Sequence, residues 1–99
     1  MELLWWDGCP SSEEAHELVR RVMADAGLDP GSLRSVEIDT DDAAERAGFV
    51  GSPTIRVDGR DVDPQSASAR PALNCRIYHK ADGRPSPVPT REQLEAALS

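Results

Sequence analysis

The sequence has no cluster of basic residues and no long apolar run. Its net charge is −7 at pH 7, with 11 lysines and arginines scattered among 18 acidic residues. Binding to nucleic acid or to an anionic membrane surface requires clustered cations, so we expect neither partner. The apolar run at residues 3–6 is far shorter than the ~20 residues of a membrane span or the apolar core of a signal peptide. We therefore expect a cytoplasmic protein.

Only two cysteines are present, and in a cytoplasmic protein such thiols are more often catalytic, redox-sensing or inert than bridged. No grouping of cysteine and histidine has the spacing of a zinc site, so we expect no metal and no other cofactor. The sequence also has no glycine-rich phosphate loop and no Ser/His/Asp set. The chain of 99 residues has the length of one domain. We expect residues 1–99 to form a single domain and a monomer.

Hydrophobic periodicity predicts an α/β fold, with a four-stranded mixed sheet flanked by three helices. Strands are expected at residues 3–6, 33–39, 54–57 and 60–62. A helical crossover should make the first two strands parallel neighbours, and Asp58-Gly59 predicts a hairpin between the last two. Residues 63–72 are expected to form a loop, and residues 75–79 are a candidate for one further strand.

Each predicted helix carries its own boundary signals. The first is expected to have Pro10 in its first position and to end at Gly27. Thr40 should cap a short second helix, because its hydroxyl can accept a bond from a free N–H. Thr90 and Gln93 match a capping box at the start of the third helix.

Cys9 lies between the first predicted strand and the first predicted helix. Free N–H groups at a helix start favour negative charge, so a thiol there has a lowered pKa. Pro10, Ser11 and Ser12 are the residues expected to stabilise the thiolate. His16 lies about two helical turns further on, too far to act as a base, and is expected to face solvent. A buried, inert thiol is the alternative, but the position at a strand–helix junction favours a functional one.

Two short segments resemble signatures of the thioredoxin superfamily. Trp-Trp-Asp-Gly-Cys-Pro-Ser-Ser at residues 5–12 resembles its active-site turn, and Val-Gly-Ser-Pro-Thr at residues 50–54 resembles its cis-proline signature. Together with Cys-Arg-Ile-Tyr at residues 75–78, they make the chain similar to a group of small bacterial thioredoxin-family proteins. Some members of that group carry selenocysteine at the position of Cys9. The resemblance implies a thioredoxin-like fold for most of the chain.

The resemblance also implies residue roles. In the superfamily the cis-proline lies opposite the nucleophile and exposes the preceding backbone for substrate pairing. Carried over, this gives a cis bond before Pro53 and makes Ser52, Pro53 and Thr54 the substrate-binding residues. The sequence departs from thioredoxins at Ser12, which stands where they have a second cysteine. Cys-Pro-Ser-Ser is instead similar to the Cys-x-x-Ser of monothiol glutaredoxins, and no disulfide can form within this motif.

These observations lead us to expect a thiol oxidoreductase. Cys9 would attack a disulfide, a mixed disulfide or a peroxide, and Cys75 would resolve the resulting adduct. The substrate would be a protein or a low-molecular-weight thiol or disulfide. A Cys9–Cys75 bridge needs Cα atoms within about 7 Å, and a Cys75 packed at a strand start is the alternative. A non-catalytic binding module that senses redox state or a soft metal is the rival hypothesis.

Overall fold

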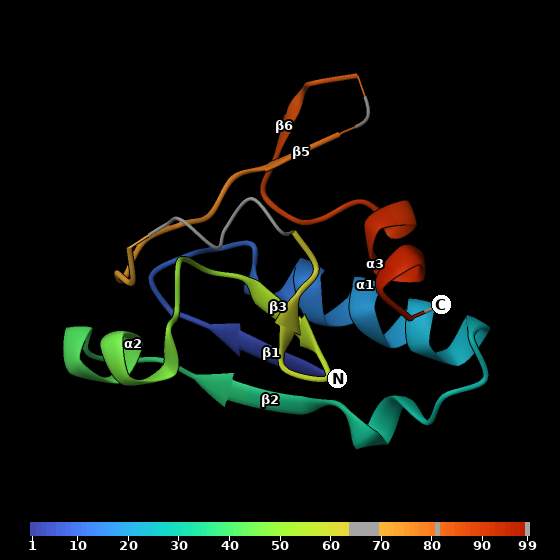
Figure 1. The fold of residues 1–99 in the computed structure, drawn as a ribbon, viewed down its shortest axis with the longest axis horizontal. Helices are drawn as coiled ribbons and strands as arrows, with labels where there is room; N and C mark the ends of the chain where they lie inside the picture. The colour runs from blue at the N-terminus through green and yellow to red at the C-terminus, as the bar shows by residue number, and fades with distance from the viewer. Residues whose placement is uncertain (64–69, 81, 99) are drawn as a thin grey trace.

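The computed structural model describes residues 1–63, 70–80 and 82–98. A four-stranded mixed sheet lies among three helices, which confirms the expected α/β class (Figure 1). The strands of this sheet are β1 (Glu2–Trp5), β2 (Arg34–Glu37), β3 (Thr54–Val57) and β4 (Arg60–Asp61). The helices are α1 (Ser12–Asp25), α2 (Asp41–Ala47) and α3 (Arg91–Leu98), with a 3-10 turn at Pro30–Ser32. β5 (Tyr78–His79) and β6 (Pro85–Ser86) form a separate two-stranded ribbon.

The strand order of the main sheet is β2-β1-β3-β4. β1 runs parallel to β2, with Leu4 opposite Val36, as the crossover through α1 requires. β1 runs antiparallel to β3, with Leu4 opposite Thr54. Asp58 and Gly59 both have positive φ, at 52° and 80°, and close the predicted hairpin between β3 and β4. The antiparallel pairing places the end of β1 beside the start of β3.

Two apolar clusters lie on opposite faces of the sheet, because successive residues of a strand point to opposite sides. Leu3 belongs to the cluster that buries α1 and α3, together with Val19, Val22 and Leu94. Leu4 belongs to the cluster on the α2 side. Its other buried members are Ile38, Ala44 and Phe49. Trp5 packs against the first cluster and Trp6 against the second, so the two indoles flank the sheet at the end of β1.

The helix boundary signals act largely as predicted. The Thr40 hydroxyl accepts a hydrogen bond of 3.0 Å from the N–H of Ala43. Thr90 and Gln93 bond reciprocally, through the Thr90 N–H at 3.0 Å and the Gln93 N–H at 3.1 Å. Gly27 follows α1 with a φ of 80°. In the described part of the chain, no helix is long and apolar enough to cross a bilayer.

The candidate strand at residues 75–79 does not join the main sheet. Only Tyr78–His79 is a strand, and it pairs with β6 in an arm that projects from the sheet and helices (Figure 1). Cys75 makes a single parallel bridge to Ser52. Most of the loop expected at residues 63–72 lies outside the described residues, and residues 70–72 carry no helix or strand.

Candidate functional site

The end of β1 and the start of β3 bring Cys9 close to Ser52. The N–H of Trp6 donates to the Ser52 hydroxyl at 3.1 Å, across 46 residues of sequence. The Cys9 N–H donates back to the Trp6 carbonyl at 3.1 Å and closes the turn that follows β1. The thiol of Cys9, when protonated, donates to the Ser52 carbonyl at 3.7 Å. The antiparallel β1–β3 register therefore fixes Cys9 against the residue before the proline.

Cys9 is buried and its sulfur is surrounded by hydrogen-bonding groups. Its side chain is 3% exposed. The Ser11 hydroxyl lies 3.1 Å from the sulfur, and the Ser11 N–H also bonds to it. The Ser52 hydroxyl, which accepts from Trp6, still has its own proton to donate to the sulfur. A thiolate at this position is therefore satisfied by donors from both segments.

The helix start differs from the prediction by two residues. α1 begins at Ser12, so Pro10 is not its first residue, and Cys9 precedes the helix by a further turn. Ser11 flanks the helix, and its carbonyl accepts from Ala15 at 3.0 Å, but its side chain makes no capping bond. The hydroxyl is directed to the Cys9 sulfur instead. Of the three residues predicted to stabilise the thiolate, Ser11 bonds to the sulfur, whereas Pro10 is exposed and Ser12 bonds to His16 through its carbonyl.

Cys75, which comes much later in the sequence, also lies beside Ser52. The Ser52 N–H donates to the Asn74 carbonyl at 2.8 Å, and the Arg76 N–H donates to the Ser52 carbonyl at 2.9 Å. These two bonds hold Cys75 opposite Ser52. The Cys75 thiol is exposed and interacts with the buried Cys9 thiol, and both cysteines are free. The structure thus brings together the two thiols that the sequence left at an unknown distance.

The two thiols differ in acidity. Burial raises the pKa of Cys9, but hydrogen bonds from Cys75, Ser11 and Ser52 outweigh it, and the pKa falls below its ordinary value. The contact with Cys9 acts in the opposite direction on Cys75 and raises its pKa to about 11, with burial and the Cys9 charge adding to the rise. The pair therefore loses its first proton from Cys9, while Cys75 remains a protonated donor.

The residues predicted to bind substrate are all buried. The Ser52–Pro53 peptide bond is cis, in agreement with the resemblance. The Pro53 carbonyl accepts a 2.5 Å hydrogen bond from the hydroxyl of Tyr78. Thr54 donates through its hydroxyl to the Gly51 carbonyl at 2.6 Å. Ser52 and Pro53 thus join the start of β3 to the segment at residues 74–78, and Thr54 bonds back to the turn before them.

Arg76 and Tyr78 fix this segment, and both were missed at the level of sequence. The Arg76 guanidinium donates two bonds to the Asp61 carboxylate, at 2.7 and 2.8 Å, and lies 4.4 Å from the centre of the Tyr78 ring. Burial lowers the pKa of Arg76, but the Asp61 hydrogen bonds outweigh it and the group stays charged. The sequence pattern gave no signal for this face, because the apolar Ile77 is exposed and the charged Arg76 is buried. Nothing local indicated Asp61 as the partner.

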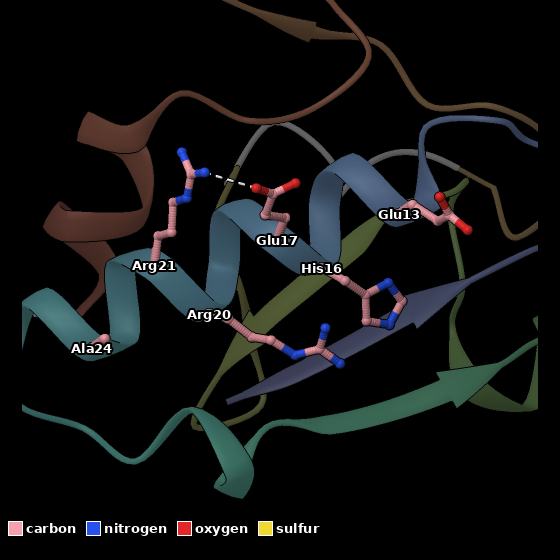
Figure 2. Close-up of a pocket in the computed structure, with 6 residues that line it drawn as sticks. All are labelled: Glu13, His16, Glu17, Arg20, Arg21 and Ala24. Carbon is pink, nitrogen blue, oxygen red and sulfur yellow. Dashed lines mark hydrogen bonds and ion pairs between the residues drawn. The ribbon is translucent and has the colours of Figure 1, made fainter.

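A surface groove along α1 is separate from the thiols. It is lined by Glu13, His16, Glu17, Arg20, Arg21 and Ala24 (Figure 2). His16 does not simply face solvent: it donates through Nδ1 to the Ser12 carbonyl at 2.7 Å, and its Nε2 lies 2.6 Å from the Ser35 hydroxyl oxygen. Its ring also meets Trp5 edge to face at 5.7 Å. These contacts attach α1 to the sheet and account for the partial burial of His16.

Comparison with protein-family models, with curated proteins and with solved structures finds no match to this chain.

Proposed function

We propose that the chain is a thioredoxin-like thiol oxidoreductase in which Cys9 is the nucleophile and Cys75 the resolving thiol. The observation that carries the proposal is the pairing of a buried, acidic Cys9 with an exposed, weakly acidic Cys75. The attacking thiol must be ionised, whereas the resolving thiol can remain protonated until the mixed disulfide has formed. The strand order, the turn after β1 and the cis bond before Pro53 support the thioredoxin-like fold.

The reaction can be written for a disulfide RS–SR. The Cys9 thiolate attacks one sulfur, a Cys9–S–S–R bond forms, and RS⁻ leaves with the electron pair of the broken S–S bond. Cys75 then gives up its proton to the released thiolate and attacks the Cys9 sulfur. The Cys9–Cys75 disulfide forms and the second RS⁻ leaves. The protein is oxidised by two electrons, the substrate is reduced by two, and an external dithiol is needed to restore the starting state.

The test is a single reaction of the reduced protein with 2-hydroxyethyl disulfide, followed by intact mass. Wild type should lose two hydrogens as the Cys9–Cys75 disulfide forms. Cys75→Ser should stop at the mixed disulfide and gain one mercaptoethanol unit. Cys9→Ser should show neither product on the same timescale. Equal rates of adduct formation in Cys9→Ser and Cys75→Ser would contradict the assignment of the nucleophile.

The adjacency of the two thiols also supports a second candidate, a sensor of a soft cation such as Cu(I). Thiolates select soft metals, and two can hold such an ion. In the described ranges, no group of three or more metal-ligating side chains surrounds them, so only these two sulfurs are offered. Competition titration with Cu(I) separates the candidates, because the sensor requires a large loss of affinity in Cys75→Ser. Equal affinity in Cys75→Ser and wild type would remove this alternative.

A further inference from the structure

The backbone edge beside Cys9 is already occupied by the chain itself. An extended peptide binds a protein edge by pairing with free N–H and C=O groups. At Ser52, the N–H is bonded to Asn74 and the C=O to Arg76, at 2.8 and 2.9 Å. Ser52 is 0% exposed. A peptide seeking this edge would meet residues 74–76 in its place.

The occupying segment is held at several points rather than resting loosely on the surface. The Arg76 side chain is 7% exposed and its partner Asp61 16%. Tyr78 is fully buried and bonds to the Pro53 carbonyl. Gly51 faces the segment so closely that an added Cβ would lie 2.5 Å from Asn74 Oδ1 and 2.9 Å from Arg76 Cβ. We call residues 74–78 the strap.

We propose that the strap restricts the Cys9 site to small disulfides and peroxides and excludes extended peptide disulfides. This inference rests on the proposed function, because it specifies the substrate class of the same site. A small disulfide needs no backbone pairing and can reach Cys9 beside Cys75, whose exposed thiol marks the open side of the centre. An extended peptide must first displace Asn74 and Arg76 from Ser52. The strap also keeps Cys75 in position to resolve, so selectivity and resolution depend on the same contacts.

The experiment compares two disulfides with the same leaving group. The small one is the symmetric disulfide of N-acetylcysteine methylamide, and the large one joins two seven-residue extended peptides through their central cysteines. Rates of Cys9–Cys75 disulfide formation are followed by intact mass on reduced wild type. We expect the small disulfide to react at least tenfold faster. Equal rates would overturn the strap proposal, whereas no reaction with either disulfide would overturn the proposed function.

A loosened strap provides the matched test. Asp61→Asn/Arg76→Gln removes both charges of the Arg76–Asp61 ion pair together, while Asp63, whose carboxylate lies 3.9 Å from Arg76, keeps its charge. The control is Arg84→Gln, since Arg84 lies in the arm with an exposed side chain paired to Asp82. The double variant should narrow the preference for the small disulfide to about threefold or less, and the control should leave it unchanged. A double variant that is folded but keeps the wild-type preference would overturn the proposal.

Hydrogen exchange on wild type covers the case in which the double variant fails to fold. The strap requires the N–H groups of Ser52 and Arg76 to exchange slowly, as amides in stable pairing do. Exchange of either amide as fast as that of an exposed turn would show that residues 74–76 do not hold the edge, and would overturn the proposal. The Gly59 amide, in the β3–β4 turn, serves as the exposed reference.

Discussion

The hydroxyl of Ser11 lies 3.1 Å from the sulfur of Cys9 and makes no capping bond to α1, although Ser11 directly precedes that helix. Serine at this position usually stabilises a helix by accepting a bond from a free N–H. Here the Ser11 side chain hydrogen-bonds to the thiol, and the helix starts without a side-chain cap. The Ser11–Cys9 contact therefore links the residue that precedes the helix to the acidity of the Cys9 thiol.

Ser11→Ala should slow alkylation of Cys9 by iodoacetamide at pH 7 by about tenfold, because a hydrogen bond to a charged group contributes about 1.5–3 kcal/mol. The measurement is the alkylation rate against pH in a Cys75→Ser background, which confines the reaction to Cys9. Ser12→Ala is the matched control. Its neighbouring hydroxyl is not among the groups that lower the pKa of Cys9, so its rate should stay near wild type. Equal effects of the two variants would contradict the role of Ser11.

Cys75 should make the protein less stable at alkaline pH. Its pKa is near 9 when unperturbed and is raised to about 11 in the folded chain, so folding favours the protonated form. The stabilisation is complete below about pH 9 and is lost as the pH rises toward 11. Urea unfolding of the reduced protein should show a steeper loss between these values in wild type than in Cys75→Ala. Parallel curves for the two proteins would show that Cys75 does not donate to Cys9.

Cys9 contributes with the opposite sign. Its pKa is lowered in the folded state, so folding favours the thiolate. This contribution is present above the pKa of the unfolded thiol and is lost as the pH falls through the folded value. Relative to Cys9→Ala, wild type should therefore gain stability over the range from the lowered pKa of folded Cys9 up to about pH 9, the ordinary value of the thiol. A constant difference across that range would indicate a thiol with an ordinary pKa.

Tyr78→Phe should lower the free energy of unfolding by about 1–3 kcal/mol at pH 7, because the buried Pro53 carbonyl loses its donor. Burial raises the pKa of Tyr78, so the folded chain favours the neutral phenol. That preference stabilises the fold below the unfolded pKa of about 10 and is lost at higher pH. The difference between variant and wild type should shrink above that pH. A constant difference would show that Tyr78 titrates equally in both states.

Arg76 and Asp61 should show strong coupling in a double-mutant cycle. Removing one partner of a buried ion pair costs about 3–5 kcal/mol, because the other charge is left without its counter-ion. The loss of stability in Arg76→Gln alone should fall near the lower end of this range, since the Asp61 side chain keeps some exposure to solvent. Asp61→Asn/Arg76→Gln should cost less than the sum of the two single variants. Additive free energies from urea unfolding would contradict direct pairing.

Gly51→Ala should destabilise the protein more than Gly59→Ala. Both glycines have positive φ, at 133° and 80°, so both substitutions strain the backbone. An added Cβ at Gly59 meets nothing within 4 Å, and its cost should be about 1–2 kcal/mol. At Gly51 the added atom also collides with Asn74 and Arg76. Similar losses of stability in the two variants would show that residues 74–76 move aside at little cost in free energy.

The elements that could be predicted from sequence are those with local signals. The Thr40 cap, the Asp58-Gly59 turn and the Thr90–Gln93 capping box each depend on a few adjacent residues, and the structure has all of them. The start of α1 was wrong by two residues, because residues 10 and 11 form a turn that places the Ser11 hydroxyl beside the Cys9 sulfur. The periodicity of apolar residues carries no information on this contact between a thiol and a hydroxyl.

The long-range part of the site could not be predicted. Cys75 lies 66 positions after Cys9 and is positioned by Ser52, by the Arg76–Asp61 pair and by the Tyr78–Pro53 bond. None of these pairings has a local signature, since each joins residues 15 to 25 positions apart. The candidate substrate-binding residues were identified through resemblance, which gave their place beside Cys9. It did not reveal that the chain covers them itself.

The alternation of residues 75–78 has a consequence for how this centre can change over evolutionary time. Arg76 and Tyr78 share the buried side and Ile77 is 62% exposed, so the direction of the Cys75 thiol depends on counting residues from these anchors. A single-codon insertion between Cys75 and Arg76 would keep every side chain and yet turn the thiol away from Cys9. Lineages that retain the contact between the two thiols should therefore tolerate substitutions in this stretch more readily than changes in its length.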